Sequence, residues 1–336
     1  MTSALSPSDP DRIFHRPVPS EDGLALAGGW ARFAEVELLA RGREPRRVAA
    51  AACPPEVLEA LTAPRPDFAG IALDAPRLMG IVNVTPDSFS DGGLWHDPQA
   101  AVAQGRALAA AGAAILDIGG ESTRPGAAEL AVAEETARIL PVIAGLAGAA
   151  PISVDTRKAA VARAACAAGA AIINDVSALD FDPGMAGAMA GTGAAVVLMH
   201  AQGSPETMQD DPRYDDVLLD VYEALEAKVA RAEAAGVPRA RIAVDPGIGF
   251  GKTAAHNLAL LRRISLFHRL GCPVLLGVSR KRFIGSLGGG APAPGRDPGT
   301  LALTLAAAAQ GVQIHRVHNV ADVAQGLALW QAATQA

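Results

Sequence analysis

The sequence predicts a (β/α)8, or TIM, barrel preceded by an N-terminal extension. Three observations predict it: a length of 336 residues, a regular alternation of short apolar runs with Ala-rich stretches from residue 77 onward, and a polar residue near the end of each apolar run. Eight strands alternating with helices over about 255 residues match the size of one such barrel. An open, doubly wound sheet is the alternative, but it usually has fewer strands, and its glycine fingerprint is absent here.

The composition is that of a globular protein. With 50% hydrophobic and 19% charged residues, the chain is too apolar for disorder. A net charge of −6 argues against a protein that coats nucleic acid or an anionic membrane. The three cysteines are far apart and form no CxxC pair, which excludes a disulfide framework and fits a reducing cytosol. Because a signal peptide and any run of about 18 apolar residues are absent, we expect a soluble, cytoplasmic protein.

Residues 1–75 are predicted to be a partly ordered extension in front of the barrel domain, residues 76–336. The first twenty or so residues are polar and proline-punctuated, so we expect them to be loosely ordered. A short helix is expected after Pro54 and Pro55, in the stretch AAACPPEVLEALTA. The sequence assigns this extension no function.

The apolar runs after residue 76 are the predicted strands. Continuous apolar runs are typical of strands buried on both faces, so the sheet is expected to be parallel. The predicted strands are 78–84, 113–119, 151–156, 171–176, 194–200, 241–246, 273–279 and 314–319. Helices are expected between them, among others at 98–112, 129–147, 157–168, 215–235 and 255–269, with a last one at 321–334. The Gly- and Pro-rich stretch 285–299 is expected to be a flexible surface loop interrupting the seventh helix.

Polar residues stand at the carboxyl end of every predicted strand. In a barrel of this kind the active site forms at that face. A polar residue there is often only a cap for the next helix, and this alternative stays open for Asp117, Asp175 and Ser279. The whole series predicts a polar funnel lined by Asn83, Asp117, Asp155, Asn174, Asp175, His200, Asp245, Ser279, Arg280, Lys281, Arg316 and His318.

Two long loops follow the first two predicted strands, at 81–93 and 117–127. Both are rich in Gly, Ser, Thr and Pro, and they carry Asp87, Asp91 and Arg124. Loops of this kind can fold over a substrate and exclude water, which we expect here. Ordinary turns held by side-chain hydrogen bonds are the alternative.

The segment DPGIGFGKT (245–253) is not a nucleotide-hydrolysing phosphate loop, because Pro246 stands where that motif needs glycine. Its glycines permit a close backbone approach to a ligand. Cations at the last two strands, Lys281 and Arg316, suit phosphate oxygens, whereas Arg280 and Arg282 suit a solvated surface. Without HxH or HxxxH spacing a transition-metal site is not expected. A magnesium ion needs few protein ligands, and Asn83 could supply one.

Several segments together resemble the dihydropteroate synthases: MGIVNVTPDSFSDGG, GGESTRPGA, VDT, IND, DPGIGFGK, SRKRFIG and RVHN. The resemblance runs in family order from Leu78 to about Trp330 and leaves out the extension. It implies a transferase that joins 6-hydroxymethyl-7,8-dihydropterin diphosphate to 4-aminobenzoate and releases diphosphate. It also implies Mg²⁺, inhibition by sulfonamides and a homodimer.

The resemblance also implies a role for each site residue. The pterin would be held by Asp155, Asn174, Asp245 and Lys281. The Mg²⁺ ion would meet Asn83, and the diphosphate would be reached by Asn83, Thr123, Arg316 and His318. The aminobenzoate pocket would be completed by Asp87, Phe89, Asp91 and Arg124. Of all these residues, the catalytic ones would be Asp91, Arg124 and Lys281.

Three positions depart from the pattern of the family. Asn319 stands where an Asp is frequent, Ala201 where a Met is frequent, and Arg282 where some members have Ser. A corrinoid methyltransferase on the same barrel is one alternative, although it should lack the STRPG and RVH segments. A pterin-binding paralogue without activity is the second alternative. A phosphosugar barrel is the third, and it leaves the NVTPDSF segment unexplained.

Overall fold

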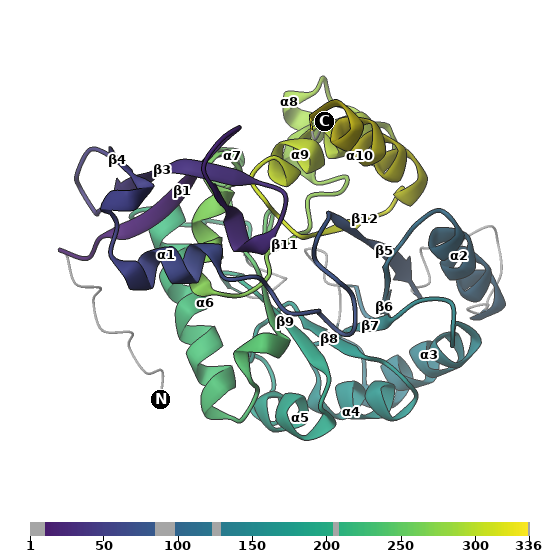
Figure 1. Ribbon diagram of the computed structural model, residues 1–336. Helices are drawn as coiled ribbons and strands as arrows, with labels where there is room; N and C mark the ends of the chain where they lie inside the picture. The colour runs from purple at the N-terminus through teal and green to yellow at the C-terminus, as the bar shows by residue number, and fades with distance from the viewer. Residues whose placement is uncertain (1–10, 85–97, 123–128, 204–207, 335–336) are drawn as a thin grey trace.

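The computed structural model describes residues 11–84, 98–122, 129–203 and 208–334. Eight parallel strands form one sheet in the order β10-β9-β8-β7-β6-β5-β12-β11. A bridge between Val244 and Val274 brings β10 and β11 together, so the sheet closes into the predicted barrel (Figure 1). The strands are β5 (Arg77–Asn83), β6 (Ile115–Gly119), β7 (Ile152–Asp155), β8 (Ile172–Asp175), β9 (Ala195–Met199), β10 (Ile242–Asp245), β11 (Leu275–Leu276) and β12 (Ile314–Val317). Each predicted strand is present, although most are shorter than expected.

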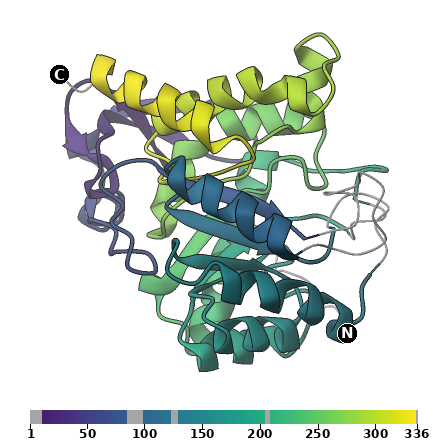
Figure 2. The same cartoon turned by 90° about the vertical axis from the view of Figure 1, so that its right-hand side faces the viewer.

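Helices surround this sheet, as Figures 1 and 2 show. They are α2 (Pro98–Ala110), α3 (Val132–Gly145), α4 (Ala159–Ala167), α5 (Met185–Thr192), α6 (Val217–Ala234), α7 (Ala254–Arg262), α8 (Arg282–Leu287), α9 (Asp297–Ala308) and α10 (Val320–Thr334). The expected helix at 255–269 divides into α7 and a 3-10 helix, η5 (Ile264–Leu270), because the backbone of Arg263 leaves the helical region. In the described part of the chain, no helix is long and apolar enough to cross a membrane.

The stretch 285–299 is not the uniform surface loop that we expected. Helix α8 ends at Leu287, and a short 3-10 helix, Pro294–Arg296, leads directly into α9. Asp297, the first residue of α9, forms a two-point ion pair with Arg280, with both N–O distances at 2.7 Å. The end of this stretch is therefore anchored to the residues that follow β11.

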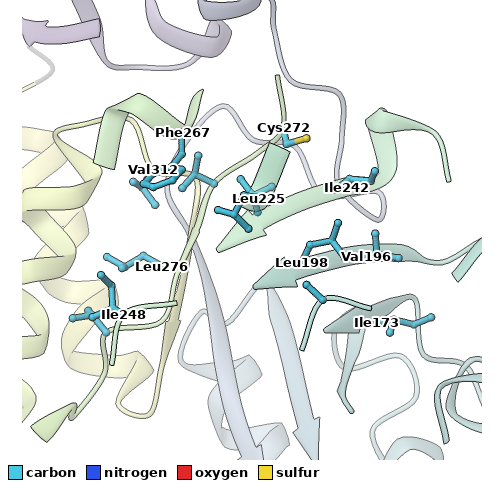
Figure 3. Close-up of a cluster of buried hydrophobic side chains, with 14 of the residues drawn as sticks. Ile173, Val196, Leu198, Leu225, Ile242, Ile248, Phe267, Cys272, Leu276 and Val312 are labelled. Atoms are coloured by element: carbon cyan, nitrogen blue, oxygen red, sulfur yellow. The ribbon is translucent and has the colours of Figure 1, made fainter. Parts of the chain in front are cut away.

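The main hydrophobic core lies between the outer face of the barrel and its helices. Figure 3 shows part of it, with Val196, Leu198 and Ile242 from the strands near Leu225 of α6 and Phe267 of η5. These five side chains are almost fully buried. Because residues of a strand alternate between its faces, the outward apolar residues leave the inward positions free for a separate set of side chains.

A second core fills the lower part of the barrel, where the strands begin. Inward residues of seven strands meet there: Met79, Ile115, Ile172, Ala195, Ala243, Leu275 and Ile314. Phe68 and Leu73, which precede the barrel in the sequence, pack into the same cluster, and Phe68 is completely buried. The segment that joins the extension to β5 therefore closes this mouth of the barrel.

The extension forms a small antiparallel sheet and a helix. Its elements are β1 (Phe14–Ser20), β2 (Leu24–Ala25), β3 (Arg32–Leu39), β4 (Arg46–Ala49) and α1 (Pro55–Thr62), with β3 in the centre of the sheet. The helix agrees with the expectation from Pro54 and Pro55. The strand at Phe14–Ser20 differs from the loosely ordered start that we expected, because β1 pairs with β3 along its whole length.

Charged and polar contacts fasten the extension to the barrel helices. Arg12 binds both carboxylate oxygens of Glu226 on α6 at 2.7 Å. Arg16 lies 2.9 Å from Glu37, which also accepts from Arg263 at 3.0 Å. Further along, the indole N–H of Trp30 donates to the carbonyl of Ala308 at the end of α9. In Figure 1 the extension (purple) accordingly lies beside α6 and α7.

Candidate active site

Along the inside of the barrel, side chains change from apolar to polar as the strands near their ends. Ile115, Ile172 and Ile314 belong to the lower core. Two residues further along the same strands, and so on the same face, stand Asp117, Asn174 and Arg316. With the corresponding residues of β7 and β10, they form a layer that we call the polar layer: Asp117, Asp155, Asn174, Asp245 and Arg316.

Arg316 joins the carboxylates of the polar layer. Its Nε atom donates to Asp117 at 2.5 Å, and its Nη2 atom donates to Asp155 at 2.8 Å. Asn174 donates from Nδ2 to the same oxygen of Asp117 at 3.2 Å. Four of the five residues of the layer are thus one hydrogen-bonded unit, drawn from β6, β7, β8 and β12.

Two carboxylate oxygens of this unit remain available. Asp117 Oδ1 and Asp155 Oδ1 are buried and have no hydrogen-bond partner among the described residues. Burial and the neighbouring Asp117 carboxylate raise the pKa of Asp155 to about 7, while Arg316 opposes this rise. A buried carboxylate oxygen without a donor is costly, so these atoms mark where a ligand with N–H groups can bind.

Asp245 lies at the end of β10, and burial raises the pKa of its carboxyl group to about 6. Its Oδ1 atom accepts a hydrogen bond from the Gly247 N–H at 2.7 Å. Gly247 has a φ of +68°, and a Cβ atom there would lie 1.8 Å from the carbonyl oxygen of His200. The glycine is therefore required by close backbone packing, which also brings its N–H to Asp245.

Lys281 is the N-cap residue that precedes α8, and its ammonium lies 3.9 Å from the centre of the Phe250 ring. A cation over an aromatic face at this distance is an attractive arrangement. Burial and the nearby Arg316 lower the pKa of Lys281 to about 8, with Asp245 and Asp155 opposing. Lys281 therefore belongs electrostatically to the polar layer.

His318 follows β12 and is held by Ser279. The two side chains are 2.9 Å apart between Ser279 Oγ and His318 Nδ1, and the same Oγ accepts from the His318 backbone N–H at 3.1 Å. A hydroxyl that accepts from the backbone can give its own hydrogen to Nδ1, which leaves Nε2 protonated. Burial and Arg316 lower the pKa of His318 to about 3, so the imidazole is neutral at pH 7.

The donor set of the site fits a magnesium ion only if a substrate supplies further oxygen ligands. The described residues contain no group of three His, Cys, Asp or Glu side chains that could hold a metal. Asn83, at the end of β5, is half-buried and has a carboxamide oxygen to offer. One protein oxygen, completed by phosphate oxygens and water, is a usual arrangement for Mg²⁺. The residues present therefore fit an ion that arrives with a diphosphate.

The structure brings together most of the described residues that the sequence singled out. Asp155, Asn174, Asp245, Lys281 and Arg316 belong to one cluster by contact or charge, and His318 borders it. Asn83 stands at the end of β5. Five further residues that the resemblance implies lie outside the described residues: Asp87, Phe89, Asp91, Thr123 and Arg124.

The possible helix caps separate into different kinds of residue. Asp175 accepts from the backbone N–H groups of Ser177 and Leu179 and so holds the turn after β8; it caps no helix, because α5 begins only at Met185. Asp117 and Ser279 instead bind Arg316 and His318, so they are part of the site. The signal for Asp117 is its position: it lies within an apolar strand, whereas a cap follows the strand.

Two departures from the family pattern have a clear place in the structure. Asn319 donates to Asp297 at 3.2 Å, and Asp297 is the partner of Arg280. A carboxylate is therefore still present near His318, supplied by α9. Arg280 is not the solvated surface cation that we expected, because this ion pair engages it, whereas Arg282 is exposed.

Comparison with known proteins shows which family the chain is similar to. Residues 79–318 match the family of pterin binding enzymes. The dihydropteroate synthase of Escherichia coli (strain K12) is 46% identical over 271 residues, covering 80% of this chain and 95% of its relative.

Solved structures of dihydropteroate synthases are also similar to this chain. The dihydropteroate synthase of Xanthomonas albilineans with 4-aminobenzoic acid is 50% identical, with a TM-score of 0.76, covering 81% of this chain and 99% of that one. The same enzyme in complex with 7,8-dihydropteroate matches at 47% identity and a TM-score of 0.74, covering 81% of this chain and all of that one. About a fifth of this chain lies outside both matches. The chain belongs to the dihydropteroate synthase family of pterin-binding enzymes.

Proposed function

We propose that this chain condenses 6-hydroxymethyl-7,8-dihydropterin diphosphate with 4-aminobenzoate, forming 7,8-dihydropteroate and diphosphate. The observation that carries the proposal is the polar layer, with its two buried carboxylate oxygens that lack a donor. A pterin presents N–H donors and ring acceptors along one edge, and such an edge complements carboxylates and a carboxamide. Membership of the family supports the same reaction.

In this proposal the pterin ring lies on the polar layer. Asp155 and Asp245 accept from the N–H groups of the ring, and the carboxamide of Asn174 matches its remaining edge. Lys281 donates to a ring acceptor from its place beside Phe250. Each of these groups is buried or half-buried, so a ring that lacks the matching groups would leave them unpaired and would be rejected.

The diphosphate lies toward Arg316 and His318. The Arg316 guanidinium keeps Nη1 free of described partners, and His318 offers Nε2–H as a neutral donor. When Mg²⁺ is bound, held by Asn83 and the substrate, it neutralises charge on the diphosphate. Departure of diphosphate leaves a cation on the pterin methylene, which the electron-rich ring stabilises. The amine of aminobenzoate then attacks as a neutral nucleophile and forms the C–N bond. The proton that its nitrogen then loses passes to the departed diphosphate, so no strong base is needed.

The proposal also gives a role to the two loops at 81–93 and 117–127. By resemblance, Asp87, Phe89, Asp91, Thr123 and Arg124 surround the aminobenzoate and the diphosphate. Exclusion of water by these loops would protect the cation from hydrolysis. Asp91 would lie near the cation, and Arg124 near the reacting groups, with Lys281 as the third catalytic residue.

The setting of the enzyme is also part of the proposal. The composition and the family support a cytoplasmic enzyme, and the same family supports a homodimer. Sulfonamides imitate 4-aminobenzoate, so they should compete with it. The relevant measurement is the Michaelis constant for 4-aminobenzoate, which should rise with sulfonamide concentration at constant kcat.

The experiment that tests the proposal is diphosphate release by purified protein, with Mg²⁺, pterin diphosphate and 4-aminobenzoate each omitted in turn. Release that needs both substrates and is matched by dihydropteroate supports the synthase. Calorimetric binding of the pterin diphosphate without release would instead identify a pterin-binding paralogue. Corrin-dependent methyl transfer would identify the methyltransferase alternative.

A further inference from the structure

Lys252 is a buried lysine to which the proposed reaction assigns no role. It follows the glycine loop, which we define as residues 246–251, and only 3% of it is exposed. Its ammonium lies 2.9 Å from the carbonyl oxygen of Gly247, 3.0 Å from that of Phe250 and 2.9 Å from Nδ1 of His200. An ammonium has three hydrogens, and each has an acceptor here, so none is left for a ligand.

The glycine loop depends on side chains for its shape. Gly247, Gly249 and Gly251 all have positive φ, which prevents a regular ladder of backbone hydrogen bonds. Other side chains hold single points of the loop: Asn257 accepts from the Gly249 N–H, and Tyr214 donates to the Gly251 carbonyl. Lys252 alone among the described side chains binds carbonyls at both ends of the turn, Gly247 and Phe250.

The same loop fixes two members of the site. The Gly247 N–H donates to Asp245, and the Phe250 ring lies under the ammonium of Lys281. The backbone of Gly249 also packs against Lys281, since a Cβ atom there would lie 3.0 Å from Lys281 Cδ. Gly247 and Phe250, whose carbonyls bind Lys252, therefore also contact Asp245 and Lys281 respectively.

We propose that Lys252 is a positioning residue of the pterin site: its ammonium fixes the glycine loop and through it the Asp245 carboxylate and the Lys281 ammonium. The inference rests on the proposed function, because it assumes that pterin binds to Asp245 and Lys281. Lys252 touches no substrate in this proposal, so its effect is transmitted entirely by Gly247 and Phe250.

The first test replaces the ammonium by an apolar chain of similar length, Lys252→Met. The dissociation constant of pterin diphosphate, measured by calorimetry with Mg²⁺, should rise roughly tenfold or more. The Michaelis constant for 4-aminobenzoate should stay within about twofold, because the loop does not reach that substrate in the proposal. Lys252→Gln keeps two hydrogen-bond donors and should recover part of the lost affinity. If the Met variant does not fold, the Gln variant is used to measure the effect on pterin affinity.

Lys228 provides a matched control for loss of stability. It is a buried lysine of α6 whose ammonium also binds backbone carbonyls, those of Ser177 and Ala178, in addition to the Asp180 carboxylate. Lys228→Met should therefore lower the free energy of unfolding as Lys252→Met does, but leave pterin affinity within about twofold. Equal losses of pterin affinity in the two variants would overturn the proposal, because they would show a general effect of destabilisation.

A double-mutant cycle with Lys281→Met makes the second test. If Lys252 acts partly through Lys281, the double variant should lose clearly less affinity than the product of the two single losses. Two results together would overturn the positioning role. The double variant would lose affinity by a factor equal to that product, and the pterin affinity of Lys252→Met would depend on pH as it does in the wild type. A wild-type protein that does not bind pterin diphosphate would instead refute the proposed function.

Discussion

Asp117 and Arg316 form an ion pair across the inside of the barrel, although β5 separates their strands in the sheet. Asp117 is fully buried, and Arg316 also binds Asp155. The guanidinium is therefore held by two carboxylates. This arrangement fixes the cation proposed to meet the diphosphate beside the carboxylates proposed to meet the pterin.

Asp117→Asn should lower the free energy of unfolding by about 3 kcal/mol, because it leaves Arg316 with one carboxylate partner in a buried setting. It should also weaken pterin diphosphate binding. Urea denaturation and calorimetry measure the two effects. Asp74→Asn is the control: it removes an exposed partner of Arg77 and should change stability by less than about 1 kcal/mol. Equal stability of the two variants would contradict the buried role.

Arg316→Ala should weaken pterin diphosphate binding by about 2 kcal/mol or more, through loss of charge-assisted hydrogen bonds. The variant also leaves Asp117 and Asp155 without their counterion, so its unfolding should be measured beside its affinity. Affinity for a pterin without the diphosphate should fall less. Unchanged affinity for the pterin diphosphate would refute the assigned role.

Asp245 should make stability depend on pH. Its pKa is raised to about 6 in the folded protein, so the fold favours the protonated form. The stabilising contribution is complete below about pH 4, the unfolded pKa, and is lost as pH rises through about 6, a change on the order of 3 kcal/mol. Asp245→Asn should flatten this part of the stability curve, as followed by urea denaturation.

Pterin binding should show the opposite trend, since the ionised Asp245 is the better acceptor. The affinity of the wild-type protein should rise through about pH 6, and the difference from Asp245→Asn should grow with it. A constant difference between the two proteins from pH 5 to 8 would argue against direct contact between Asp245 and the pterin.

Ser279→Ala should lower kcat, by roughly tenfold, because His318 loses the hydroxyl that fixes its ring and its protonated nitrogen. The Michaelis constant for 4-aminobenzoate should change little. Ser286→Ala is the matched control, since among the described residues Ser286 binds only backbone carbonyls of its own helix. The outcome that contradicts the role is the same kcat for both variants.

Phe68→Ala should cost about 4 kcal/mol of stability, since it empties the lower core of a fully buried ring. Substrate constants should remain near those of the wild type in the folded fraction, because the ring lies at the mouth opposite the site. Thermal unfolding and steady-state kinetics measure the two effects. Leu329→Ala, at an exposed position of α10, should leave stability almost unchanged.

The alternation of apolar runs with Ala-rich stretches predicted the barrel correctly, because each of its strands is an apolar run between turn residues. It could not locate the pairing of β1 with β3, since Pro17 and Pro19 make that strand resemble a loop. Phe68 also gave no signal, as its burial depends on seven strands that come later in the chain. Contacts between distant segments decide both features.

The site was predictable to the extent that its residues stand in recognisable segments. Asp155, Asn174, Asp245 and Arg316 were located in this way. The part played by Asp117 and Ser279 depends on which side chains meet across the barrel, and sequence order does not give that. Pro246 excluded a phosphate loop at 245–253, and no role was predicted for Lys252, whose ammonium turns back into its own loop.

The docking of the extension has a consequence for synthesis of the protein. Arg12 needs Glu226, which comes 214 residues later, and Trp30 needs Ala308, which comes 278 residues later. At usual translation rates that second interval lasts on the order of tens of seconds. The extension is therefore synthesised well before the helices on which it docks, and until they appear it has only its own small core, which contains Phe33, Val36 and Leu61.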